Sequence, residues 1–237
     1  GDAVNFVAKA TQLARAGFTS TDAALDILTT SLNAYGLEAE DVARVSDVLI
    51  NTQNLGKTTV DQLASSMGKV IPTAKANGVA IEDLAGAYAV MTANGIATAE
   101  TTTYFNSMLN ELGKNGSSAA NAFAAGTAEI KEGGLTMKEA MDMGYSLTDV
   151  LKVLDKQAEE SGTTLSNMFG SAEAGKAAAV LLDNADKLDS AVEAMGASAG
   201  STESAYDKLN TTSFEIDKTI NELKVTLIEI GDALKAE

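Results

Sequence analysis

The sequence predicts an all-α protein, an array of short antiparallel helices (helical hairpins) followed by a longer C-terminal amphipathic helix. Three observations support this fold class. Hydrophobic residues make up 45% of the chain but aromatic residues only 5%, Pro72 is the single proline among 237 residues, and apolar residues recur at helical intervals. Strands favour β-branched and aromatic residues, whereas Ala and Leu favour helices. A chain of this length and hydrophobicity can bury a substantial core.

A glycine followed five residues later by an acid recurs along the chain. The pairs are Gly17/Asp22, Gly36/Asp41, Gly56/Asp61, Gly78/Asp83, Gly95/Glu100 and, further on, Gly144/Asp149. Glycine suits the left-handed residue just past a helix end, and an acid suits the first turn of the next helix. Each pair therefore predicts a helix junction, with room for helices of about 12 to 15 residues between junctions. Residues 1–113 are predicted to form a helical core with these quasi-repeated junctions.

Apolar residues predict the individual helices of this core. They share a helical face in five successive sets: Ala24, Ile27, Leu28, Leu32 and Tyr35; Val42, Val45, Leu49 and Thr52; Leu63, Met67, Val70 and Ile71; Leu84, Tyr88 and Met91; and Tyr104, Phe105, Met108, Leu109 and Leu112. Thr59 and Gln62 have capping-box spacing at the start of the third helix. Pro72 lacks an amide donor and crowds the preceding turn, so a kink or short break is expected before Ala74.

Stretches of small and polar residues predict the boundaries in the second half. Residues 114–134 combine Asn-Gly, Gly-Gly and Ser-Ser steps and are expected to form a flexible or hinge segment. Residues 135–195 are predicted to be a second helical region. Residues 196–201, Gly-Ala-Ser-Ala-Gly-Ser, are predicted to be a linker.

Residues 202–237 are predicted to form the C-terminal helix, and its apolar residues form a heptad seam. The seam consists of Ile216, Ile220, Leu223, Leu227, Ile230 and Leu234, separated by alternating steps of four and three residues. This spacing is typical of a coiled coil. An amphipathic helix that packs on other helices of its own chain has the same pattern. The seam is therefore the candidate site for helix packing or self-association.

No catalytic, cofactor-binding or metal-binding residue is expected, and the sequence predicts no enzyme. The absence of His and Cys excludes catalytic triads and most transition-metal sites. Carboxylate pairs such as Glu38 and Glu40 could hydrolyse glycosides, but no Trp is present to line a sugar subsite. No run matches a calcium-binding EF-hand loop. Gly-Lys-Thr at 56–58 lacks the first glycine of a phosphate-binding loop, because Asn51 occupies its position.

The charge of the chain argues against nucleic-acid binding. Seventeen basic and 33 acidic residues give a net charge of −16, which repels a phosphate backbone. The longest uncharged stretch near the middle, 84–99, is shorter than the roughly 20 apolar residues that span a bilayer, and no signal peptide is evident. We therefore expect no membrane segment in these residues. Because the sequence begins at Gly1 and not at a methionine, we interpret it as a fragment of a longer protein.

The amino-acid sequences of the junctions, and their order along the chain, resemble the core region of phage tail tape-measure proteins. The similar segments are 16–18, 22–24, 32–37 (Leu-Asn-Ala-Tyr-Gly-Leu), 46–49, 56–64 (Gly-Lys-Thr-Thr-Val-Asp-Gln-Leu-Ala), 78–84 (Gly-Val-Ala-Ile-Glu-Asp-Leu) and 201–206 (Ser-Thr-Glu-Ser-Ala-Tyr). The similarity is dense from about residue 10 to 112 and again from about 172 to 234, and looser between them.

This resemblance implies a structural segment that helps set tail length and scaffolds assembly of the tail tube. The protein would lie in the lumen of the tube in the virion, and in the host cytoplasm before assembly. Its implied partners are copies of itself, the tail tube protein, and tail-tip or baseplate proteins, with no cofactor. The alternative is a non-viral helical interaction or adaptor module whose seam binds partner helices. A carboxylate-based hydrolase is a second, more distant alternative.

Overall fold

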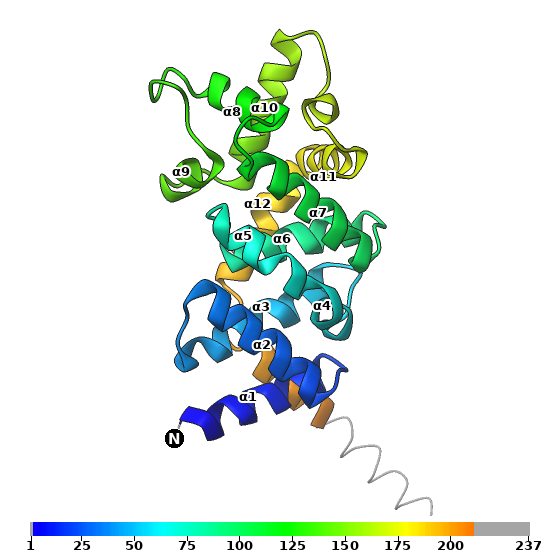
Figure 1. The fold of residues 1–237 in the computed structure, drawn as a ribbon. Helices are drawn as coiled ribbons and strands as arrows, with labels where there is room; N and C mark the ends of the chain where they lie inside the picture. The colour runs from blue at the N-terminus through cyan, green and yellow to red at the C-terminus, as the bar shows by residue number, and fades with distance from the viewer. Residues whose placement is uncertain (1, 211–237) are drawn as a thin grey trace, which may run out of the picture.

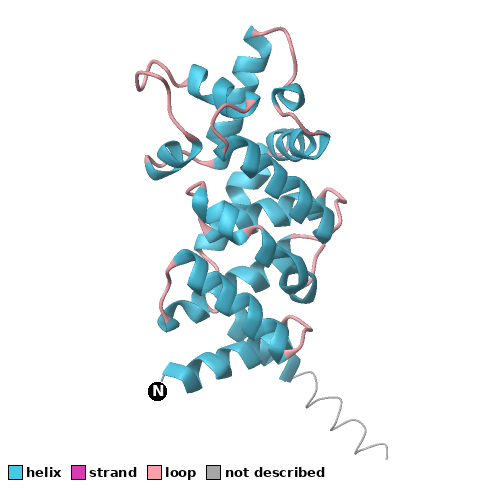
Figure 2. Ribbon diagram, in the orientation of Figure 1, coloured by secondary structure: helices cyan, strands magenta, loops and turns pink. Residues whose placement is uncertain are grey.

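The computed structural model describes residues 2–210, and all regular structure in that range is helical. The predicted all-α class is confirmed. The helices stack into an elongated body with the N-terminal helix at one end, and loops gather along its two sides (Figure 1, Figure 2). The heptad seam predicted at 216–234 lies outside the described residues.

The helices follow one another with short connections. They are α1 (Asp2–Ala16), α2 (Thr21–Tyr35), α3 (Val42–Leu55), α4 (Val60–Ser66), α5 (Ile71–Ala76), α6 (Ile81–Ala93), α7 (Thr98–Gly113), α8 (Ser118–Gly126), α9 (Met137–Asp142), α10 (Leu147–Glu160), α11 (Ala172–Asp183) and α12 (Ala185–Gly196). Three 3-10 turns accompany them: η1 (Ala39–Asp41), η2 (Met67–Lys69) and η3 (Leu165–Met168). Residues 201–210 are also helical.

Helix α6 lies at the centre of the hydrophobic core. Ten of its thirteen residues are buried, including Leu84, Tyr88 and Met91. A helix that is apolar on all sides must be surrounded, and α6 contacts α3, α5, α7, α11 and α12. The buried hydroxyl of Tyr88 forms a hydrogen bond of 2.6 Å with that of Thr102 on α7. Burial raises the pKa of Tyr88, so the phenol stays neutral there.

Four of the six predicted junctions share one backbone geometry. Their glycines have φ between 66° and 93°, and the following residue's amide donates to the carbonyl five positions earlier, which satisfies the helix end. The acid then accepts a hydrogen bond from the amide that precedes the next helix. These four glycine and acid pairs are Gly36/Asp41, Gly78/Asp83, Gly95/Glu100 and Gly144/Asp149.

The prediction of a left-handed glycine is wrong at the other two junctions, those of Gly17 and Gly56. Phe18, not Gly17, has the positive φ of 53°, and Gly56 is extended with φ of −99°. Both glycines are required by close packing instead. A Cβ on Gly17 would lie 2.5 Å from Cβ of Val60, and one on Gly56 would lie 2.5 Å from Oγ1 of Thr92.

The break predicted near Pro72 is present, but it precedes the proline. Helix α4 ends at Ser66, η2 follows, and α5 begins at Ile71 with Pro72 in its first turn. Proline is tolerated there because the first amides of a helix have no intrahelical acceptor. Pro72 therefore starts a short helix and does not kink a long one.

The division at 114–134 stays a prediction, as do the linker at 196–201 and the other boundaries. Residues 114–134 include helix α8, whose Phe123 is 1% exposed. The hydroxyl of buried Thr127 accepts a hydrogen bond of 2.8 Å from the amide of Leu135. Helix α12 ends at Gly196, where the predicted linker begins.

The second half of the chain packs back on the first. The most extensive contacts join helices far apart in sequence, α7 with α11 and α6 with α12. After α12 the chain runs back along the stack and reaches α1 (Figure 1). We call residues 185–210 the returning segment.

Candidate functional site

The helix junctions form two columns, one along each side of the stack. Junctions at Gly17, Gly56 and Gly95 form the first column, and those at Gly36 and Gly78 form the second (Figure 1). Within the first column, Gly17 contacts Val60 and the hydroxyl of Thr19 donates a 2.7 Å hydrogen bond to Asp61. Each junction therefore packs on the second junction along the chain.

The same column continues upward through threonine contacts. The amide of Lys57 donates to Oγ1 of Thr92 at 3.1 Å, and the hydroxyls of Thr58 and Thr98 lie 2.7 Å apart. Thr58, Thr92 and Thr98 are all buried. Because buried hydroxyls cost free energy unless they are paired, this arrangement fixes how one junction sits on the next.

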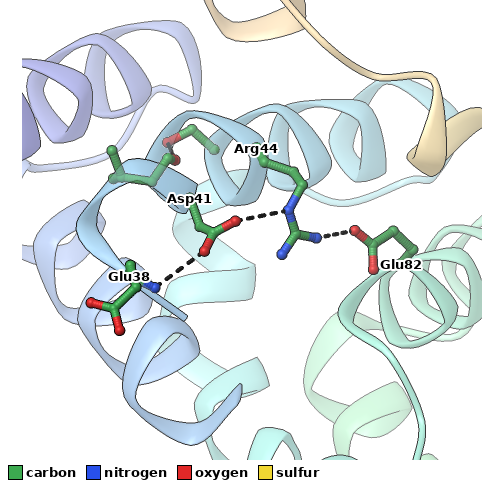
Figure 3. Close-up of polar contacts among 6 residues, drawn as sticks. Glu38, Asp41, Arg44 and Glu82 are labelled. Carbon is green, nitrogen blue, oxygen red and sulfur yellow. Dashed lines mark hydrogen bonds and ion pairs between the residues drawn. The ribbon is translucent and has the colours of Figure 1, made fainter. Parts of the chain in front are cut away.

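The second column is joined by Arg44 (Figure 3). Its guanidinium contacts Asp41 at 3.4 Å and forms an ion pair with Glu82. Asp41 also accepts a 3.1 Å hydrogen bond from the amide of Glu38, which caps the turn before α3. Arg44 thus links the acid of one junction to the first turn of α6, one layer further on. The side chain of Arg44 is 42% exposed, so this pair contributes geometry more than stability.

Tyr35 completes the second column. Its hydroxyl donates to the carbonyl of Val79 at 3.1 Å, and the ammonium of Lys75 lies 5.7 Å from the centre of its ring. Burial raises the pKa of Tyr35, and the negative charges of Glu82 and Asp83 raise it further. The phenol therefore remains a hydrogen-bond donor at any physiological pH.

The returning segment is fixed by a buried carboxylate on α3. Asp47 is 6% exposed, and its two oxygens each accept a 2.8 Å hydrogen bond, from the amides of Gly200 and Thr202. These amides lie at the start of the helix at 201–210, where a negative charge is favourable. Asp47 thereby connects two parts of the chain that are far apart in the sequence.

Three further contacts support the returning segment. A Cβ on Gly86 would lie 2.8 Å from a methyl group of Val192, so α6 and α12 approach closely because residue 86 is glycine. The side-chain amide of Asn51 donates to the carbonyl of Ala194 at 2.9 Å. Near the N-terminus, the guanidinium of Arg15 lies over the ring of Tyr206 at 5.7 Å.

Comparison with known proteins places these helices in a family. The model of the phage-related minor tail protein family matches residues 1–172. The chain belongs to this family. It is also 37% identical over 232 residues to a probable tape measure protein of Clostridium phage phiCD119. That match covers 98% of this chain but 24% of the relative, so the chain spans about a quarter of the relative's length. No solved structure matches it.

The resemblance to tape-measure proteins inferred from the junctions is thus confirmed by membership of the minor tail family. Two acids of the chain have clear structural roles. Asp41 accepts a hydrogen bond from the backbone amide of Glu38 in a turn cap, and Glu111 accepts hydrogen bonds from the amides of Gly170 and Ser171 just before α11. Among residues 2–210, no cluster of three or more acids is placed to hold a metal ion, and no helix is long and apolar enough to cross a membrane.

The Gly-Lys-Thr tripeptide at 56–58 belongs to a packed junction of this minor tail protein. Thr58 pairs with Thr98, and a phosphate would have to displace that contact. A hollow of about 430 Å³ lies between α6 and α12. Its wall is made mainly of small and apolar residues, including Leu55, and also contains Asp186, Lys187 and Ser190.

Sequence reasoning missed the pairing of alternate junctions. Gly17, Gly56 and Gly95 are evenly spaced along the chain, and a similar interval separates Gly36 from Gly78. Intervals between neighbouring glycines hide this period, which spans two helices and their connections. Asp47 was missed as well. Its position between Val45 and Val48 is the signal, because a charged residue on an apolar helix face needs a buried partner.

Proposed function

We propose that this chain is a structural segment of a phage tail tape-measure protein, which helps set tail length and scaffolds assembly of the tail tube. The observation that carries the proposal is the 37% identity to a probable tape measure protein across 98% of the chain. The segment acts through its helix junctions and packing surfaces and performs no catalysis. Its helical hairpins, which repeat at the interval between alternate junction glycines, are the units whose number contributes to length.

The proposed location is the lumen of the tail tube in the virion, after assembly in the host cytoplasm. The net charge of −16 supports a place in a channel through which DNA later passes, because like charge repels the phosphate backbone. Such repulsion acts over about 8 Å at physiological salt, so it prevents adhesion without blocking passage. The proposed partners are further copies of the protein, the tail tube protein, and tail-tip or baseplate proteins.

A duplication of one structural period in the full-length phage gene tests the length role. Repeating residues 18–56 adds a second copy of α2, η1 and α3, and joins Gly56 to the residue that normally follows Gly17. If the added helices run end to end along the tube, tails lengthen by about 60 Å, at about 1.5 Å per residue. If they add two layers to the stack, tails lengthen by about 20 Å, since packed helices lie about 8–10 Å apart. Electron microscopy of purified tails distinguishes these lengths.

Two controls make this test specific. A Gly-Ser insertion of the same length after Gly56 matches the added chain but supplies no helix and no junction. Deleting residues 18–56 should shorten tails by the same step that the duplication adds. Tails of unchanged length in both the duplication and the deletion would refute the ruler role, provided that the variant proteins are found in the virions.

A further inference from the structure

An asparagine precedes a glycine at three places in the chain, each just past the end of a helix. Asparagine is among the thermolabile residues of proteins. In an Asn-Gly step the glycine nitrogen can attack the side-chain carbonyl carbon of the asparagine, because glycine has no Cβ to hinder the approach. The product is a succinimide ring. The three steps are Asn77-Gly78 after α5, Asn94-Gly95 after α6 and Asn115-Gly116 after α7.

The first step is held by hydrogen bonds and by packing. The side-chain amide of Asn77 donates to the carbonyl of Thr73 at 2.9 Å, and the amide of Gly78 donates to the carbonyl of Lys75 at 3.1 Å. Asn77 is 6% exposed, and a Cβ on Gly113 would lie 2.2 Å from its Oδ1. The side chain of Asn77 therefore cannot turn toward the Gly78 nitrogen without breaking these contacts.

The second step is exposed, but hydrogen bonds hold it as well. The side-chain amide of Asn94 donates to the carbonyl of Val90 at 2.8 Å. The amide of Gly95 donates to the carbonyl of Thr92 at 3.0 Å. Both groups that would react therefore have partners at the end of α6, although solvent reaches Asn94.

The third step differs in each of these respects. Asn115 and Gly116 are both exposed, and within residues 2–210 neither the Asn115 side chain nor the Gly116 amide has a hydrogen-bond partner. A Cβ on Gly116 would meet no atom within 4 Å, so a ring has room to form. The step lies in a turn closed by a hydrogen bond of 3.1 Å, from the amide of Ser117 to the carbonyl of Lys114. Such an exposed turn opens easily.

We propose that Asn115 deamidates in the folded protein and that the fold protects Asn77 and Asn94. The Gly116 nitrogen forms a bond to Cγ of Asn115, and the bond from Cγ to Nδ2 breaks. The proton of the Gly116 amide leaves with Nδ2 as ammonia, by way of solvent. Water then opens the ring at either carbonyl and gives aspartate or isoaspartate.

The product changes the connection between α7 and α8. Either acid adds a negative charge beside Lys114, and isoaspartate also adds a carbon to the main chain. The hydroxyl of Ser117 caps α8, since it accepts a 3.1 Å hydrogen bond from the amide of Ala120, and it donates to the carbonyl of Glu111. A longer backbone displaces this turn, so isoaspartate loosens the start of α8. The inference goes beyond the proposed role in the tail and does not depend on it.

Incubation of the 237-residue chain at mildly alkaline pH tests the proposal, because base removes the proton of the attacking amide. Pepsin digestion in acid, where the reaction is slow, followed by mass spectrometry measures the loss of each amide. Asn115 should convert about tenfold or more faster than Asn77 and Asn94, since two hydrogen bonds must open before either of those reacts. In guanidinium chloride, which removes the fold, the three should convert at similar rates.

Asn115→Gln is the matched control. It keeps an exposed amide at the same place, but glutamine would have to close a larger ring and should stay unconverted. Hydrogen exchange in 118–126 should accelerate as isoaspartate accumulates in the native chain and should stay constant in Asn115→Gln. Conversion of Asn77 or Asn94 as fast as Asn115 in the folded chain would overturn the proposal, as would an Asn115 that converts only in guanidinium chloride. Unchanged exchange in 118–126 would overturn the effect on α8.

Discussion

Replacing Asp47 with alanine removes the carboxylate that holds the returning segment. Two hydrogen bonds of 2.8 Å are lost, to the amides of Gly200 and Thr202. Gly200 is exposed and water can replace its acceptor, but Thr202 is 3% exposed and its amide loses its partner in the interior. An unsatisfied buried amide costs about 1–3 kcal/mol, and the lost charge at the helix start adds about 0.5–1 kcal/mol. We expect the free energy of unfolding to fall by about 2–4 kcal/mol.

The assay is urea unfolding followed by circular dichroism, combined with hydrogen exchange on residues 198–206. Asp47→Asn keeps one acceptor oxygen and should lose about half as much free energy. Asp26→Ala is the control, because Asp26 is an exposed acid on α2 whose loss should change stability by less than about 0.5 kcal/mol. A loss below about 1 kcal/mol in Asp47→Ala, or unchanged exchange in 198–206, would refute the assignment.

Three further predictions concern the junctions and the upper part of the stack. Gly17→Ala should cost more than Gly36→Ala in urea unfolding, about 2–3 against about 1–2 kcal/mol, because the first forces its Cβ onto Val60 whereas the second has free space and only a left-handed φ. Phe123→Ala should cost about 3–5 kcal/mol, since its side chain is 1% exposed; a loss under about 1 kcal/mol would instead favour the hinge predicted at 114–134. The pKa of Glu139 is lowered to about 2, chiefly by Lys131 and next by the Thr136 amide, so its stabilising contribution is present above about pH 4.5 and is lost as the pH falls toward 2. Carboxyl NMR titration of Glu139 checks the value, and Glu139→Gln should remove this part of the acid dependence.

Local chemistry made much of the fold predictable. The glycine that ends a helix and the acid that caps the next are neighbours in sequence, so Gly36 and Asp41 could be assigned their roles from spacing alone. Gly17 could not, because its role depends on Val60, which approaches only in the folded stack. The family was likewise evident from the order of the junctions.

Long-range contacts account for what sequence reasoning could not reach. The partners of Asp47 are Gly200 and Thr202, and no helical period relates them to α3. Arg44 has an acid close to it in the sequence, yet the structure also pairs it with Glu82 in the next layer. A charged residue in an apolar run indicates that a partner exists, but it does not identify the partner.

The returning segment gives the stack an unusual mechanical character. Residues 2 and 210 both lie at the α1 end, so a tensile force applied between them does not load the long axis of the body (Figure 1). Such a force peels the stack open from that end, and the Asp47 contacts and the stacking of Arg15 on Tyr206 are the first to bear it. Contacts opened one after another yield at lower force than contacts sheared together. The body should therefore resist a pull between residues 2 and 210 less than a pull applied along its long axis.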